Sequence, residues 1–292
     1  MPISAGPARQ LLLALFLSAL LNASFFATKT QAQEPPGQIG VSPSMFEFAI
    51  GMEPVDKSLQ LANMKTKPVR VKVEVYNWTL DENNAIQLLP PDRQSLDQWM
   101  LIQPVDFTVE PGKTQTVRFS IRPRSKPEAG EHRAIIYFVE QPDSEKTESA
   151  SIEMLFRLGV GVYGYAEPVV RKAVIHGVQL ARQADSSPEI RIDVENKGNV
   201  HSRVQGSFSV WEKRSFPGFA ALPQKLLAQG ASTRPPEGFI GSGSLDNTPV
   251  LAGKRRILKT GLAPLPDGKE YIIAVQGTLD GQKVETALSW SP

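Results

Sequence analysis

Residues 151–163 form the segment whose residue types and spacing are best suited to binding chemistry. Its apolar residues occupy every second position: Ile152, Met154, Phe156, Leu158, Val160 and Val162. Because successive side chains of a β-strand point to opposite faces, this spacing predicts a strand with one continuous apolar ridge. Such a ridge is either buried in its own domain, with Glu153 and Arg157 facing water, or offered to another protein. An offered ridge would form an exposed apolar patch that requires a partner or self-capping by a homodimer.

Residues that usually catalyse reactions or bind metals form no recognisable motif. The histidines lie far apart without neighbouring ligands at metal-site spacing, and the carboxylates near residue 190 do not match an EF-hand loop. These candidates are His132, His176, His201, Asp185, Asp193 and Glu195. The chain also lacks a nucleophile elbow, a phosphate-binding glycine loop and a zinc-protease motif. We therefore expect no catalytic residues, no metal site, no cofactor and no enzymatic activity.

The N-terminal 32 residues have the organisation of a secretory signal peptide. Arg9 precedes an apolar stretch over residues 11–21, and small and polar residues follow up to Ala32. The apolar stretch is shorter than the ~20 residues of a membrane-spanning helix. We therefore expect an exported, soluble protein that begins near Gln33. The chain contains no cysteine, so its domains have to be stabilised by their hydrophobic cores rather than by disulfides.

The charge of the exported chain is balanced. The formal net charge of +2 includes Arg9 and Lys29 of the leader, which contains no acidic residue, so 30 basic and 30 acidic side chains remain. A neutral chain gives no electrostatic reason to expect a nucleic-acid partner or an anionic membrane.

Short alternating runs separated by turn residues predict an all-β protein with two immunoglobulin-like β-sandwich domains joined by a short elbow at residues 166–170. The first domain covers residues 33–168, with strands expected at 44–50, 57–63, 69–78, 99–102, 114–121, 132–140 and 151–163. The second covers residues 169–292, with strands expected at 170–180, 189–195, 200–210, 255–261, 270–278 and 282–290. Residues 211–250 are rich in Pro, Gly and Ser, and we expect them to form a long disordered or loosely packed loop.

The first domain resembles the periplasmic pilus-assembly chaperones of the PapD-like family. The motifs that carry this resemblance are Val41-Ser42-Pro43, the strand 59–63, residues 109–118, residues 130–134, Tyr137-Phe138 and the alternating strand that closes at Pro168. The second domain matches more loosely, through the turn at residues 195–199 and the sandwich pattern.

This resemblance implies function by donor-strand complementation in the periplasm. The strand at about 151–163 would fill the groove of an incomplete immunoglobulin-like pilin or another secreted subunit, and the family also implies an outer-membrane usher as partner. Edge hydrogen bonds would then provide affinity, and alternate side chains would fill pockets. The predicted client-binding residues are Ile152, Met154, Phe156, Leu158 and Val160.

The sequence departs from the family at one functional site, which has two anchor positions. Family chaperones bind the terminal carboxylate of the subunit with an Arg on the opening strand and a Lys near the end of the donor strand. In this chain those positions correspond to about Met45 and to Val162 or Tyr163, so the carboxylate anchor is absent. A divergent chaperone with another client, and a periplasmic or cell-surface immunoglobulin-like structural module that binds partners through its loops, both remain open.

Overall fold

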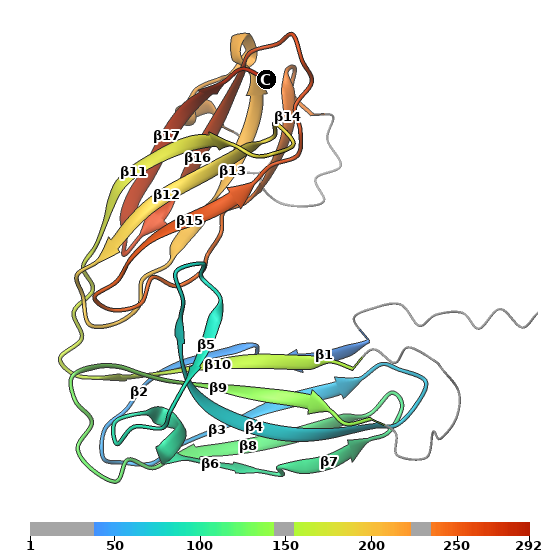
Figure 1. Cartoon of the computed structure of the whole chain (residues 1–292), viewed down its shortest axis with the longest axis vertical. Coiled ribbons are helices and arrows are strands. Elements are labelled where there is room, and N and C mark those ends of the chain that lie inside the picture. The colour runs from blue at the N-terminus through green and yellow to red at the C-terminus, as the bar shows by residue number, and fades with distance from the viewer. Residues whose placement is uncertain (1–37, 143–154, 223–234) are drawn as a thin grey trace, which may run out of the picture. The chain divides into compact units, whose positions relative to one another are not determined.

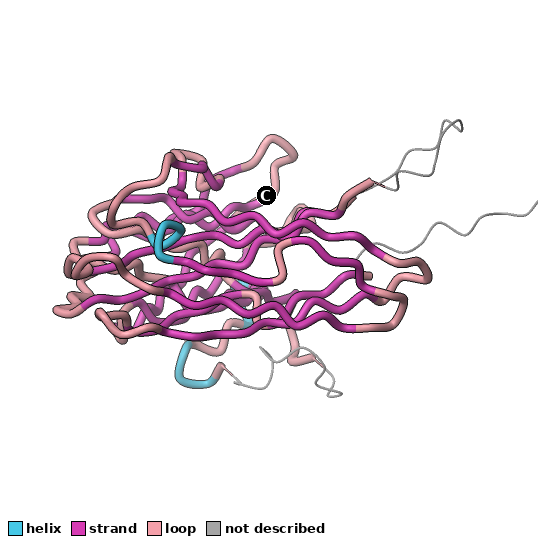
Figure 2. Tube along the Cα trace, turned by 90° about the horizontal axis from the view of Figure 1, so that it is seen from below, coloured by secondary structure: helices cyan, strands magenta, loops and turns pink. Residues whose placement is uncertain are grey.

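The computed structural model describes residues 38–142, 155–222 and 235–292, and the regular secondary structure of this part is almost entirely β-strand (Figures 1 and 2). The short helices are the 3-10 turns η1 (Leu96–Trp99), η2 (Lys213–Ser215) and η3 (Phe219–Ala221). None of the described helices is long and apolar enough to cross a membrane. The predicted all-β class is confirmed, whereas the predicted leader lies outside the described residues.

The first sandwich is formed by two sheets. One has the order β1-β3-β8-β6, and the other has the order β2-β10-β9-β4-β5, with β7 paired to β4. The strands are β1 (Ile39–Ser42), β2 (Met45–Ala49), β3 (Val55–Asn63), β4 (Val69–Leu80), β5 (Ile86–Leu89), β6 (Met100–Gln103), β7 (Asp106–Val109), β8 (Thr114–Ile121), β9 (Gly130–Glu140) and β10 (Arg157–Ala166).

The second sandwich contains a sheet of order β11-β12-β15 and a sheet of order β14-β13-β16-β17. Its strands are β11 (Ala173–Arg182), β12 (Pro188–Asn196), β13 (Val204–Glu212), β14 (Phe239–Ser244), β15 (Arg255–Gly261), β16 (Tyr271–Leu279) and β17 (Gln282–Trp290). Strand pairing within the described sheets joins β1–β10 only with one another and β11–β17 only with one another.

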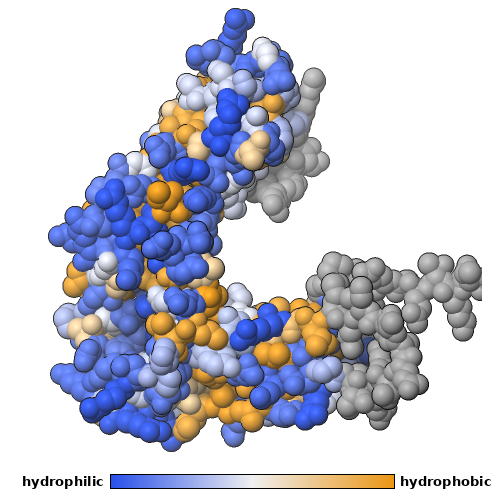
Figure 3. Space-filling model, in the orientation of Figure 1, coloured by the Kyte–Doolittle hydropathy of each residue, from blue (hydrophilic) through white to orange (hydrophobic). Residues whose placement is uncertain are grey.

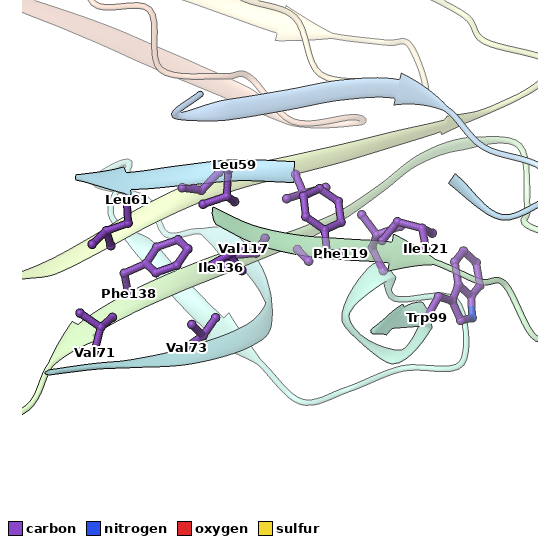
Figure 4. Packing of buried hydrophobic residues seen from close by; sticks show 14 of the residues in the cluster. Leu59, Leu61, Val71, Val73, Trp99, Val117, Phe119, Ile121, Ile136 and Phe138 are labelled. Carbon is purple, nitrogen blue, oxygen red and sulfur yellow. The ribbon is translucent and has the colours of Figure 1, made fainter. Parts of the chain in front are cut away.

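Period-two alternation builds the core of the first sandwich. Along β4, Val69, Val71 and Val73 are buried, whereas Arg70 and Lys72 between them are exposed. Strands β3, β8 and β9 contribute in the same way, and Figure 4 shows their apolar side chains meeting between the sheets. This burial provides the main stabilisation of a domain without disulfides.

The strand predicted over residues 44–50 corresponds to β2, and the structure adds a preceding strand, β1, that was not predicted and lies in the other sheet. β1 pairs antiparallel with β3, and after Pro43 the chain continues as β2, which pairs parallel with β10. The strands β5 and β7 were not predicted, because each contains only four residues. Periodicity is weak evidence over so short a run.

The prediction of a loose loop over residues 211–250 is wrong for its C-terminal part. β14 pairs with β13, and Leu245 and Val250 are buried in the second core. The sequence of β14, FIGSGS, alternates glycine and serine and therefore carries little hydrophobic signal. A Cβ on Gly243 would lie 2.8 Å from the Phe208 ring, so glycine is required where this strand crosses an aromatic side chain.

A buried asparagine closes the corresponding turn in each sandwich. At the end of β3, Asn63 Nδ2 donates to the carbonyl oxygens of Lys67 and Val109, and its Oδ1 accepts the Lys65 N–H. At the end of β12, Asn196 donates to the carbonyl oxygens four residues ahead and at Val250, and it accepts the N–H two residues ahead. Each buried side chain thus satisfies three backbone groups of its turn.

Replacing Asn196 with alanine is expected to lower the free energy of unfolding by about 2 kcal/mol or more, because two buried carbonyls and one N–H lose their partner. Urea denaturation followed by circular dichroism measures this change. Asn247 is exposed, so Asn247→Ala is the matched control and should change stability little. Equal stability of the two variants would contradict the role assigned to Asn196.

Candidate functional site: the edge of β10

Among the described strands, β10 has a neighbour along its whole length on one side only. It pairs with β9 from Arg157 to Ala166, but the parallel strand β2 covers its other side only from Gly161 to Tyr165. Residues 157–160 therefore form a sheet edge, which we call the free edge. Unpaired edges are templates for pairing with another chain.

The register shows which backbone groups point outwards. The N–H of Glu140 in β9 donates to the Phe156 carbonyl at 3.0 Å, and the N–H of Ile50, just after β2, donates to the Tyr165 carbonyl at 2.9 Å. Because hydrogen-bonding sides alternate along a strand, even-numbered residues of β10 bond to β9 and odd-numbered residues face the opposite side. The N–H and C=O of Arg157 and Gly159 therefore have no strand beside them in the described part of the chain.

The side chains of the predicted ridge differ in burial. Val160 has an exposed fraction of 0% and belongs to the core, whereas Phe156 and Leu158 are half-buried and pack against its rim. The predicted exposed patch therefore does not include Val160, because the strand is enclosed between β9 and β2 immediately beyond it. Ile152 and Met154 lie outside the described residues.

The free edge is bordered by other apolar side chains. Leu155 and Met45 are 45% and 41% exposed, and Ile39 and Val41 of β1 are partly buried against the same core. Figure 3 shows hydrophobic residues gathered on the first sandwich where β1 and the start of β10 lie. An apolar seam thus accompanies unpaired backbone groups, which is the combination that β-augmentation uses.

Arg157 lies on the opposite face from the ridge. Its guanidinium carbon is 3.8 Å from the centroid of the Tyr137 ring, and a guanidinium nitrogen is 4.0 Å from a Glu74 carboxylate oxygen. This stacking holds the first residue of β10 against β9 without using its backbone. Arg157 therefore faces solvent on the outer side of the sheet, away from the ridge.

A guanidinium does reach the two places where the family anchor would lie, but the second sandwich supplies it. Arg203, just before β13, has Nη2 at 2.9 Å from the Tyr163 hydroxyl and 3.4 Å from the Met45 sulfur. Arg203 also donates to the Asn247 carbonyl and to His201 Nε2. No motif in the sequence marked Arg203, because its partners other than His201 are 40 or more residues away along the chain.

Next to Arg203 lies a buried acid–imidazole pair. His201 and Glu131 have side chains only 3% and 1% exposed, and His201 Nδ1 lies 2.5 Å from Glu131 Oε2. Burial alone would raise the pKa of Glu131, but hydrogen bonds from His201 and the nearby Arg133 outweigh it, so the pKa is lowered. Burial is also the main reason that the pKa of Tyr163 rises to about 12.

The other histidines have separate partners. The His132 ring lies within hydrogen-bond distance of the carbonyls of Gln94 and Glu128, and His176 pairs with Glu195 at 2.7 Å. Across the described residues, no group of three or more His, Cys, Asp or Glu side chains is arranged to hold a metal ion.

Residues 38–163 match the family model of the PapD N-terminal domain of pili and flagellar-assembly chaperones. This part of the chain is therefore similar to the N-terminal domain of the PapD-like chaperones. The match ends within β10 and so includes the free edge. The comparison with curated proteins found no match.

Solved chaperone structures show low similarity over most of the chain. The class 5 fimbriae chaperone CfaA is 11% identical, with 86% of this chain and 98% of that chain covered and a TM-score of 0.42. The CsuC–CsuE chaperone–tip adhesion subunit complex of Acinetobacter baumannii gives 11% identity, the same coverage and a TM-score of 0.44. The E. coli chaperone DraB is 12% identical over 87% of this chain and 98% of that chain, with a TM-score of 0.40.

Proposed function

We propose that this protein is a periplasmic chaperone that binds pilin-like or other secreted subunits by lending them the edge of β10 and that passes them to an outer-membrane usher. The observation that carries the proposal is the free edge itself, where no described strand pairs with the outward N–H and C=O groups of Arg157 and Gly159. The similarity of residues 38–163 to the PapD N-terminal domain supports the same role. The proposal includes no catalytic step.

Each part of the edge has its own task. The backbone groups of Arg157 and Gly159 would extend the sheet by pairing with a client strand, and Phe156 and Leu158 would supply apolar contact at the rim of the core. Val160 would remain in its own core and support the strand from within. We extend the proposed contact to Ile152 and Met154 on the strength of the alternation alone.

A proline substitution tests the backbone contribution. In Arg157→Pro, the N–H that points away from β9 is lost, and the pairing with β9 is retained because Arg157 does not bond to β9. Arg157→Ala is the matched control, because it also removes the stacked guanidinium but keeps the N–H. Both variants and the wild type are used for affinity capture from the native periplasm, after circular dichroism has shown that they fold.

Capture of an abundant subunit by wild type and Arg157→Ala, but not by Arg157→Pro, is the expected result. Equal capture by the two variants would contradict strand pairing at this edge and favour the structural module, whose partners bind elsewhere. Size-exclusion chromatography of the client-free protein tests self-capping, since a homodimer paired through the free edge should dissociate in Arg157→Pro but not in Arg157→Ala.

A further inference from the structure

The free edge begins at an ion pair that no sequence motif marked. Lys65, in the turn between β3 and β4, has Nζ at 2.8 and 3.0 Å from the two carboxylate oxygens of Glu140, the last residue of β9. The two side chains are only 21% and 11% exposed. The pair therefore links the two sheets of the first sandwich at the point where β10 starts.

The side-chain carboxylate of Glu140 also accepts a backbone hydrogen bond that a strand carbonyl would normally accept. In the antiparallel register, Phe156 lies opposite Glu140, and the Glu140 N–H donates to the Phe156 carbonyl. In a regular antiparallel pair the Phe156 N–H would donate to the Glu140 carbonyl. Here it donates to the side-chain oxygen Glu140 Oε2 at 3.2 Å instead. The side chain thus fixes the residue that precedes the free edge.

Lys65 contacts the side chain of Phe156, whereas Glu140 bonds to its backbone. Its Nζ lies 5.7 Å from the centroid of the Phe156 ring, which is within the range of a cation–π contact. Lys65 is in turn held by its backbone N–H bond to the buried side chain of Asn63. A continuous series of contacts therefore runs from a buried asparagine to the backbone and the ring of Phe156.

We infer that Lys65 and Glu140 are positioning residues that hold Phe156 in strand conformation and so keep the free edge ready to pair. This inference rests on the proposed function, because its purpose is to present the edge to a client. A preformed edge loses less conformational freedom when a client strand pairs with it. Neither residue has to contact the client.

Hydrogen exchange of the client-free protein tests the positioning role directly. Glu140→Ala is expected to speed exchange of the Phe156 amide at least about tenfold, because its charged acceptor is removed. The double variant Lys65→Glu with Glu140→Lys reverses the ion pair but leaves no carboxylate at position 140, so fast exchange should persist. The control is Asp106→Asn, which removes the exposed Arg70–Asp106 ion pair in the same sandwich.

Two exchange results would overturn the inference. One is unchanged exchange of Phe156 in Glu140→Ala. The other is slow exchange restored by the charge reversal, which would mean that the pair acts only by attraction between the sheets.

Affinity capture separates this inference from the proposed function. Weaker capture by Glu140→Ala than by Asp106→Asn supports positioning, whereas fast exchange with undiminished capture overturns it. The latter result leaves strand donation intact, since Arg157→Pro tests that independently. If wild type captures nothing, the proposed function fails, and the exchange data still decide whether the pair orders Phe156.

Discussion

Replacing Phe138 with alanine lowers the free energy of unfolding by about 3–5 kcal/mol, the range found for buried aromatic side chains. The ring has an exposed fraction of 0%, and it lies opposite Val73 of β4 and Leu158 of β10 in the sheet register. Figure 4 shows it among the apolar side chains of the core. Its removal leaves a cavity directly beneath the strand that carries the free edge.

Urea denaturation measures this loss, and two substitutions calibrate it. Val139→Ala changes the next residue of β9, which faces the outside of the sheet and is half-buried, and should cost much less. Phe138→Leu should fall between the two, because most of the volume is kept. A cost below about 1 kcal/mol for Phe138→Ala would show that the sheets close over the cavity or that the ring does not contribute to the core as described.

Replacing Glu131 with alanine is expected to destabilise the protein by about 3–5 kcal/mol, because breaking a buried ionic hydrogen-bond network leaves its partners unpaired. Glu131 Oε2 accepts both the backbone N–H and Nδ1 of His201, and Oε1 accepts from Arg133. Arg203 Nε donates to His201 Nε2, which also lies 3.5 Å from a Glu47 carboxylate oxygen. The loss therefore affects groups in both sandwiches.

The Glu131–His201 pair makes the free energy of unfolding depend on pH in the acidic range. Although burial opposes ionisation, the hydrogen bonds and positive charges lower the pKa of Glu131 below its ordinary value of 4.5. A lowered carboxyl pKa contributes stability that is fully present above the unfolded-state value and is lost as the pH falls through the folded-state value. The free energy of unfolding of the wild type should therefore fall as the pH drops below about 4.5.

Urea denaturation at a series of pH values compares the two proteins. Glu131→Ala should be less stable near neutral pH and should show a shallower decline in acid than the wild type. Glu128→Ala removes an exposed carboxylate from the loop just before β9 and should retain the wild-type acid profile. An acid profile of Glu131→Ala that is parallel to the wild type would show that Glu131 is not the group that titrates.

The sequence alone determined the all-β class and most of the strands. Backbone pleating puts every second side chain on one face, so a buried face appears in the chain as period-two alternation, as in Val69, Val71 and Val73. The motifs from Val41 to Pro168 also led to the PapD-like resemblance, and residues 38–163 match the N-terminal domain model of those chaperones. Where the local signal was absent, as in the glycine and serine strand β14, the prediction was wrong.

Only the tertiary structure decided which part of the alternating strand has a free edge. Residues 156–162 repeat the same pattern, but Val160 and Val162 are buried whereas Phe156 and Leu158 lie at the rim of the core. The difference depends on β2, a strand more than 100 residues earlier, which pairs with β10 only from Gly161 onwards. Contacts between distant segments likewise bring Lys65 and Arg203 to β10. The sequence could not predict these contacts, because period-two alternation shows which side chains share a face of a strand but not which strands become neighbours.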